Sequence, residues 1–188
     1  MATLISIDIE LNAIRSFLET VATAADSEYA RIKIKSDTGE FSHYDDEANA
    51  YFVPEMWEEL AIRATLGELN ALVEWELKNI PTGLSTSKQS KKQNGRLRFG
   101  LDLKMNEIVE RIENYYKIEI KDIAGYEDVK NIGDKVNSFK HRKGFKHPYK
   151  DACKVIGERF ELTREEAFQS IDSVRTFLKD IWARTNSK

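Results

Sequence analysis

The sequence predicts an all-α protein, a bundle of four to five helices in one domain that spans residues 1–188. Helix-breaking residues are rare, because the chain has only three Pro and nine Gly. Several long stretches repeat apolar residues every three or four positions, which is the spacing of one face of an α-helix. The length is that of a single domain with one sizeable core.

The first helix is expected over residues 4–24. Its apolar face is formed by Ile7, Leu11, Ile14, Leu18 and Val21. An Ala-rich end followed by Asp26 closes it. The region of residues 30–40 has two interpretations, because Ile32 and Ile34 alternate with lysines and a turn-like sequence follows. It forms either a short hairpin or irregular insert, or a continuation of the helix.

The second helix begins at about Asp46 or at Pro54, which is tolerated in a first turn, and ends near Asn79. Its expected buried stripe consists of Trp57, Leu60, Ala61, Ala64, Leu72 and Trp75. Two glutamates near its end are able to orient a histidine across the bundle. We expect Glu76 to be solvated or ion-paired, and Glu74 to be the better candidate for a site.

A basic loop follows the second helix at about residues 81–100. No acidic residue occurs between Ile80 and Leu101, and the loop is expected to be exposed and mobile. Its lysines are candidates for contacts with a nucleic-acid backbone; they are Lys88, Lys91 and Lys92.

The second half of the chain predicts further helices at about residues 102–117, 126–142 and 150–158. The last helix begins after Thr163-Arg164-Glu165-Glu166, which has the form of a capping box. An apolar face that includes Phe177 and Leu178 follows.

The composition excludes several classes of protein. No apolar run approaches the roughly 20 residues that span a bilayer, so no membrane partner is expected. The N-terminus lacks the basic stretch of a secretory signal, so we expect none, and Cys153 is the only cysteine in the sequence; both favour a cytoplasmic protein. His43 stands beside two carboxylates without a third convergent ligand, so we expect a helix cap there, with Asp45 or Asp46 at the N-cap position, and no metal or cofactor.

Charge is distributed unevenly along the chain. Residues 1–80 hold 16 acidic and 6 basic side chains, whereas residues 81–188 hold 16 acidic and 23 basic. Such a split is typical of separate acidic and basic faces, and it is compatible with nucleic-acid binding.

The main candidate site is the basic segment from Val136 to Lys150. It contains two of the three histidines, five Lys or Arg residues, and no Asp or Glu. Histidine can move a proton from or to a ribose or leaving oxygen, and a neighbouring cation can bind phosphate. These are the requirements of RNA cleavage. A solvated basic turn is the alternative interpretation.

This segment resembles the motif of the HEPN superfamily (higher eukaryotes and prokaryotes nucleotide-binding), whose helical bundles carry Arg, four to six residues, then His. Arg142 and His147 match that spacing, although Lys143 stands where active members have Asn, Asp or His. In a second register, Asn137 and His141 match Arg-Asn-x-x-x-His, with Val136 in place of the arginine. The sequence leaves both registers open.

The resemblance implies an RNA-directed protein, a metal-independent endoribonuclease of toxin or phage-defence type that forms a homodimer. It implies that His141 or His147 acts as general base or acid, that Arg142 binds the scissile phosphate, and that Asn137 orients the reacting group. An antitoxin or another protein partner is expected. The basic side chains beside the motif that would bind nucleic acid are Lys140, Lys143 and Lys146. The competing hypothesis is a catalytically inactive helical module that binds a nucleic acid, a nucleotide or a protein.

Overall fold

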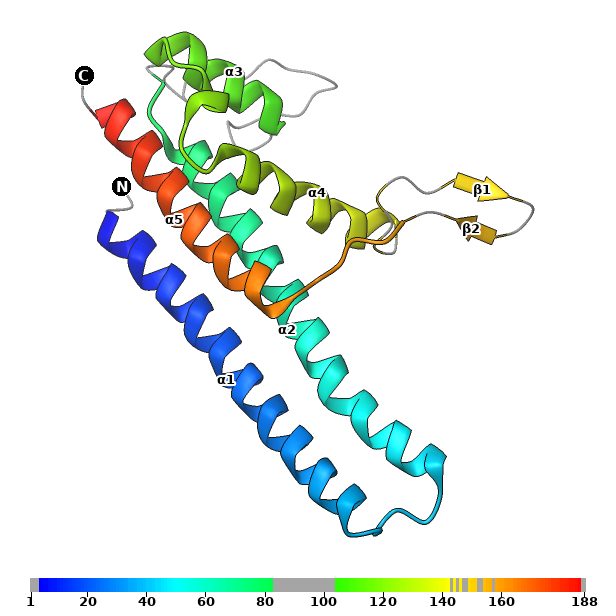
Figure 1. Ribbon diagram of the computed structural model, residues 1–188. Coiled ribbons are helices and arrows are strands. Elements are labelled where there is room, and N and C mark those ends of the chain that lie inside the picture. Colours follow the sequence, from blue (N-terminus) through cyan, green and yellow to red (C-terminus); the bar gives the residue numbers. More distant parts are fainter. Residues whose placement is uncertain are drawn as a thin grey trace, which may run out of the picture.

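The computed structural model describes residues 4–82, 104–142, 144, 146, 149–151, 154–156 and 158–186. In this part of the chain five α-helices form a bundle, which confirms the predicted all-α class (Figure 1). The elements are α1 (Leu4–Asp37), α2 (Tyr44–Asn79), α3 (Met105–Tyr116), a 3-10 turn η2 (Ile120–Asp122), α4 (Tyr126–Arg142), strands β1 (Tyr149–Asp151) and β2 (Lys154–Ile156), and α5 (Arg164–Asn186).

Helices α1 and α2 form a long antiparallel pair that extends past the start of α5 (Figure 1). The predicted end of α1 near residue 24 is wrong, because the helix continues to Asp37. Ala22 and Ala25 are buried, so the alanines pack in the core instead of ending the helix. Of the two interpretations of residues 30–40, the helical continuation is correct, and a turn through Gly39, whose φ is +68°, leads to α2.

Helix α2 starts at Tyr44, earlier than either predicted start, and contains Pro54 in its interior. Its predicted buried stripe is largely wrong. Trp57, Leu60 and Trp75 are 42%, 54% and 55% exposed. Ala61 and Leu72 are buried as predicted, and they belong to a core-facing side that is turned away from the exposed tryptophans. This side consists of Ala61, Ile62, Thr65, Leu66, Leu69, Leu72, Val73, Glu76 and Leu77.

Helix α4 has the predicted bounds. Its start is pressed against α5: Gly125 has a φ of +80°, and a Cβ placed on it would lie 2.7 Å from the carbonyl oxygen of Ser173. The backbone N–H of Ala124 donates to Asp180 of α5 at 3.0 Å. Ile132 and Val136 then face the common core.

A short antiparallel hairpin, β1–β2, replaces the helix predicted at residues 150–158. The last helix, α5, begins as predicted, since the Thr163 side chain accepts a hydrogen bond from the Glu166 N–H at 3.1 Å. The Glu166 carboxylate does not complete a capping box among the described contacts. It pairs instead with Lys135 of α4 at 2.8 Å.

One cluster of buried apolar side chains joins all five helices, and α5 supplies several of its fully buried members. Two threonines are also buried in this core. The Thr185 hydroxyl donates to the Ile181 carbonyl at 2.9 Å, whereas the Thr65 hydroxyl has no hydrogen-bond partner among the described residues. None of the helices in the described part of the chain has an apolar stretch that could cross a bilayer.

Candidate functional site

The C-terminal turn of α4 presents part of the predicted motif. Asn137, Lys140 and His141 are all exposed. Because α4 persists to Arg142, Asn137 and His141 lie one turn apart on the same face. No hydrogen bond or ion pair joins any of these three side chains to another described residue. They are therefore available to a ligand.

The other predicted residues divide into two groups. Lys146 is not a free cation, since its Nζ lies 2.7 Å from a carboxylate oxygen of Glu158, an acid that the basic segment itself does not contain. The remaining residues lie outside the described part of the chain: Lys143, His147, Lys88, Lys91 and Lys92, together with the Arg142 side chain.

The end of α4 is held by Phe139 and Gly144. Gly144 has a φ of +86°, and a Cβ on it would lie 2.8 Å from the Phe139 ring. Its N–H donates to the Ser138 carbonyl at 3.1 Å, which satisfies one of the open carbonyls at the helix end. The Arg63 guanidinium of α2 lies 5.0 Å from the centre of the Phe139 ring. These contacts fix the turn that carries His141 against α2.

The chain then returns to this turn through backbone pairing. The Lys146 N–H donates to the Glu158 carbonyl at 2.8 Å, and the Phe160 N–H donates to the Gly144 carbonyl at 2.9 Å. This extended pairing and the β1–β2 hairpin are both incompatible with the helix predicted at residues 150–158. It also brings Arg159 beside Phe139.

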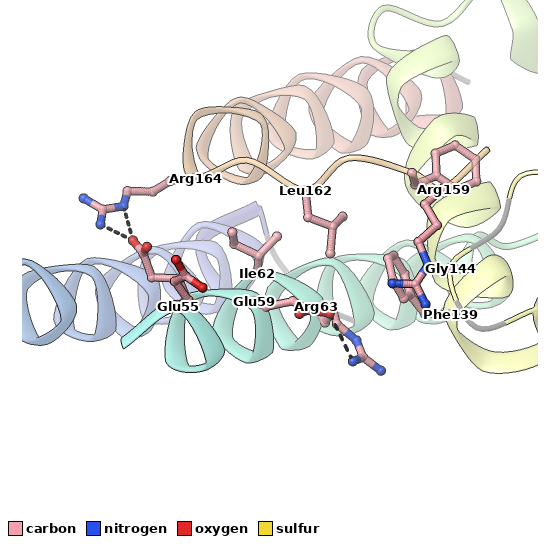
Figure 2. Close-up of a pocket in the computed structure, with 11 residues that line it drawn as sticks. Glu55, Glu59, Ile62, Arg63, Phe139, Gly144, Arg159, Leu162 and Arg164 are labelled. Atoms are coloured by element: carbon pink, nitrogen blue, oxygen red, sulfur yellow. Dashed lines mark hydrogen bonds and ion pairs between the residues drawn. The ribbon is translucent and has the colours of Figure 1, made fainter. Parts of the chain in front are cut away.

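A cavity of about 680 Å³ opens next to this turn, between α2 and the segment that leads into α5. Ile62 and Leu162 lie at its middle, Phe139, Gly144 and Arg159 at one end, and Glu55 and Arg164 at the other (Figure 2). Three glutamates and three arginines line it, so its described charges balance. Arg63 lies 3.6 Å from Glu59. Neither Asn137 nor His141 lines this cavity.

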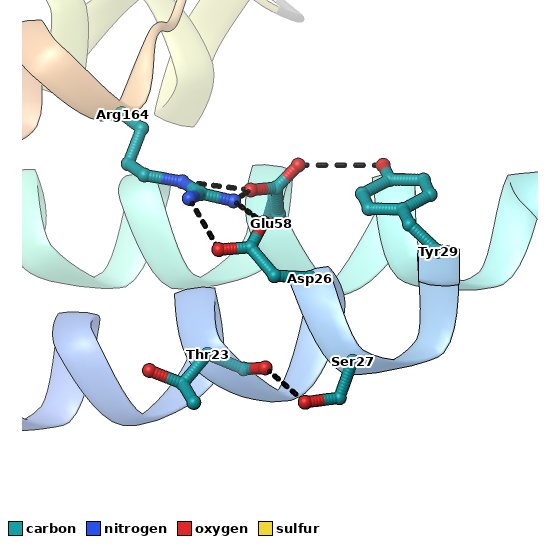
Figure 3. Close-up of polar contacts among 6 residues, drawn as sticks. All are labelled: Thr23, Asp26, Ser27, Tyr29, Glu58 and Arg164. Atoms are coloured by element: carbon teal, nitrogen blue, oxygen red, sulfur yellow. Dashed lines mark hydrogen bonds and ion pairs between the residues drawn. The ribbon is translucent and has the colours of Figure 1, made fainter. Parts of the chain in front are cut away.

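Arg164 fixes the far end of the cavity (Figure 3). Its guanidinium donates twice to Asp26 of α1, at 2.8 and 3.0 Å, and twice to Glu58 of α2. The hydroxyl of Tyr29 donates to the other oxygen of Glu58 at 3.3 Å. The start of α5 is thereby tied to both long helices.

This network shifts the pKa of each partner in a consistent direction. Hydrogen bonds to Asp26 and Glu58 raise the pKa of Arg164, and the same arginine lowers the pKa of Asp26. Burial, and then the charge of Glu58, raise the pKa of Tyr29. The cluster is therefore charged on Arg164 and Asp26 and neutral on Tyr29 at pH 7. The sequence contained one indication of this cluster, which is Arg164 in the first turn of a helix. A cation there interacts unfavourably with the helix dipole, so nearby acidic side chains are expected to neutralise it.

Glu76 does not have the solvated position that the sequence suggested. It is 2% exposed and accepts a hydrogen bond from the Trp182 indole N–H at 3.2 Å. Burial raises the pKa of its carboxyl. It lies about 20 Å along α2 from Arg63 at a rise of 1.5 Å per residue, so it does not orient His141. Among the described residues, Glu74 accepts a hydrogen bond from Asn70 at 2.9 Å and pairs with Lys78 at 3.8 Å, both in its own helix.

Among the described residues no group of three or more His, Cys, Asp or Glu side chains is placed to hold a metal. His43 occupies the N-cap position of α2, where the sequence suggested Asp45 or Asp46.

Residues 136–142 of the motif segment form the C-terminal end of α4, which precedes α5 in the chain. The chain matches no family model, and the searches of curated proteins and of solved structures gave no match either.

Proposed function

We propose that the exposed turn at the end of α4 binds RNA and cleaves it without a metal ion. The observation that supports this is the pair Asn137 and His141, which are exposed one turn apart and have no partner among the described residues. Lys140 lies beside them. In this register His141 is the functional histidine of a HEPN-like site.

The reaction follows from these groups. The neutral imidazole of His141 accepts the proton of a ribose 2′-hydroxyl, whose oxygen attacks the adjacent phosphorus. The bond to the 5′-oxygen breaks, that oxygen takes a proton from a second histidine, and a 2′,3′-cyclic phosphate remains. Asn137 orients the reacting hydroxyl, and Lys140 and Arg142 oppose the charge that develops on the phosphate. His147 or His141 of a second copy supplies the second histidine.

The biological setting belongs to the same proposal. A metal-independent endoribonuclease of this kind acts in the cytoplasm as a toxin or in phage defence, works as a homodimer, and has an antitoxin as its protein partner.

A catalytically inactive interaction module is the second candidate function. It is favoured by the exposed apolar side chains of α2 and by the balanced charge of the cavity, which does not select for a polyanion. In this case the module binds a protein through these side chains, or binds RNA or a nucleotide at the α4 turn without cleaving it.

The test is cleavage of a labelled RNA in the presence of EDTA. We expect His141→Ala and Asn137→Ala to abolish cleavage and Arg142→Ala to reduce it strongly. His43→Ala is the matched control, since His43 is an exposed histidine at the start of α2 and should have no effect. Loss with His147→Ala but not with His141→Ala would assign the site to the other register.

Two outcomes contradict the proposal. If cleavage survives His141→Ala, His147→Ala and Arg142→Ala, the site is elsewhere. If the wild-type protein does not cleave RNA but binds it, and Lys140→Ala weakens that binding, the inactive module is correct.

A further inference from the structure

The extended segment that leads into α5 contains a stretch of unpaired backbone. Its pairing with the α4 turn ends at Phe160, whose N–H donates to the Gly144 carbonyl. No hydrogen bond within the described part of the chain involves the backbone N–H or carbonyl of Glu161 or Leu162. Successive residues of a strand turn these groups to opposite edges, so those of Glu161 face away from Gly144. An edge of this kind is a template to which another strand can add.

The side chains of this segment alternate as in a β-strand. Phe160, Leu162 and Arg164 all line the cavity beside α2. Glu161 and Thr163, which alternate with them, do not. The segment therefore runs along the cavity and turns one face toward it. A strand that paired with its edge would also direct every second side chain into the cavity.

The opposite wall of the cavity, α2, offers two charged groups to such a strand. Glu55 and Arg63 lie eight residues apart on one face of α2, and both line the cavity. Glu55 forms no hydrogen bond or ion pair with another described residue. Arg63 lies 3.6 Å from Glu59, which is longer than a hydrogen bond, so its guanidinium keeps donors for a ligand. Arg159 adds a second positive charge toward the same end (Figure 2).

The spacing of these charges fits an extended peptide. Eight residues of α2 cover about 12 Å at a rise of about 1.5 Å per residue. Four steps along a β-strand cover about 13 Å at about 3.3 Å per residue. The first and fifth side chains of an added strand therefore reach Glu55 and Arg63. The third side chain reaches the middle of the cavity, which Ile62 and Leu162 make apolar (Figure 2).

We infer that this cavity binds an extended peptide, which adds as a strand to residues 160–163 and carries a basic, an apolar and an acidic side chain at alternate positions. The segment runs from the Arg159 end of the cavity to the Arg164 end (Figure 2). Antiparallel pairing, which is slightly more stable per residue, makes the peptide start beside Glu55. Its basic residue is therefore N-terminal to its acidic one. Main-chain hydrogen bonds supply affinity, and the three side chains select the sequence.

Other occupants fit the cavity less well. A nucleic acid would bring its phosphates against Glu55 and Glu59 as well as against the arginines. A small zwitterion would satisfy the two charges, but it would leave the backbone of Glu161 unpaired. The inference does not rest on the proposed function, because neither Asn137 nor His141 lines this cavity.

The test is fluorescence anisotropy of the labelled peptide Lys-Ser-Leu-Ser-Glu, capped at both ends, with the full chain at low ionic strength. We expect saturable binding, and about tenfold weaker binding of the reversed peptide Glu-Ser-Leu-Ser-Lys, because each of its charges meets a like charge. Replacing its central leucine by serine should also weaken binding of the first peptide.

A charge exchange locates the basic end of the peptide. Glu55→Lys should weaken binding of the first peptide by about tenfold, and the peptide Glu-Ser-Leu-Ser-Glu should recover it. Arg63→Gln should weaken binding at the acidic end. Glu68→Lys is the matched control, since it makes the same change of net charge at an exposed glutamate of α2 that does not line the cavity. It should leave the dissociation constant unchanged.

Amide hydrogen exchange tests the strand pairing itself. The Glu161 amide has no hydrogen-bond partner among the described residues, so it should exchange rapidly in the free protein. We expect the bound peptide to slow this exchange by about tenfold or more, because the N–H then donates to the peptide backbone.

Four outcomes overturn the inference. They are no binding of these peptides at millimolar concentration, a reversed peptide that binds as tightly as the first, binding that Glu55→Lys and Arg63→Gln leave unchanged, and binding without protection of the Glu161 amide. None of these results decides the proposed function, because RNA cleavage and its loss in His141→Ala are measured separately.

Discussion

Replacing Thr65 by valine should stabilise the protein. The Thr65 side chain is 1% exposed and its hydroxyl has no hydrogen-bond partner in the described part of the chain, so folding removes that hydroxyl from water without compensation. Such a group costs about 1–3 kcal/mol. Valine has nearly the same shape and a similar helix propensity, so the substitution removes that cost and changes little else. We expect the free energy of unfolding to rise by about 1 kcal/mol.

Thermal unfolding followed by circular dichroism checks this value. For a chain of this size, 1 kcal/mol corresponds to a rise in Tm of about 2–4 °C. Thr185→Val is the matched control, because Thr185 is also buried in a helix but donates to Ile181 at 2.9 Å. That variant should be neutral or less stable by up to about 1 kcal/mol. If Thr65→Val is no more stable than wild type, the hydroxyl is satisfied in the folded protein and the reasoning is wrong.

Four further substitutions test the described contacts by thermal unfolding. Gly144→Ala should destabilise the fold by about 1–3 kcal/mol, because alanine meets both the positive φ and the ring beneath it; Gly39→Ala, with positive φ but open space, should cost less. Arg164→Met should destabilise the protein at pH 7. The hydrogen bond from Arg164 holds the pKa of Asp26 below its usual 3.8 in the folded protein. The ion pair therefore stabilises the fold fully above pH 3.8, and this stabilisation is lost as the pH falls through the lower pKa of the folded state. The difference from wild type should therefore shrink in acid. The pKa of Glu76 is raised above its usual 4.5, so wild type loses stability as the pH rises from that value through the folded pKa. Glu76→Gln should remove that loss, so the variant should exceed wild type in stability by the largest amount at neutral pH.

Local periodicity predicted α4 and α5 well, because each has a single apolar face that packs in the core. The start of α5 also followed from Thr163, whose capping contact is local in sequence. The end of α1 was not predicted correctly, because aspartate is a residue type that often ends a helix and Asp26 was read in that way. In the fold it remains helical and binds Arg164, which is remote in the chain.

The errors at α2 and at residues 150–158 have different physical reasons. Periodicity identifies an apolar face but does not say whether the same chain or another one covers it, so Trp57 and Trp75 were assigned to the core. The hairpin depends on backbone pairing between Gly144 and Phe160, which no local pattern reveals. For the candidate site, helix geometry correctly placed Asn137 and His141 on one face. The acid beside Lys146 comes from the returning strand and could not be predicted.

The projecting end of the α1–α2 pair has a consequence for local unfolding. Among residues 27–57, which are all described, only Ile32 and Pro54 are buried. Pro54 also lacks the backbone N–H that would bond to the preceding turn of α2. Little apolar burial opposes the opening of this segment, so its free energy of opening is lower than that of the core helices. Its amide hydrogens therefore exchange with solvent before those of α5.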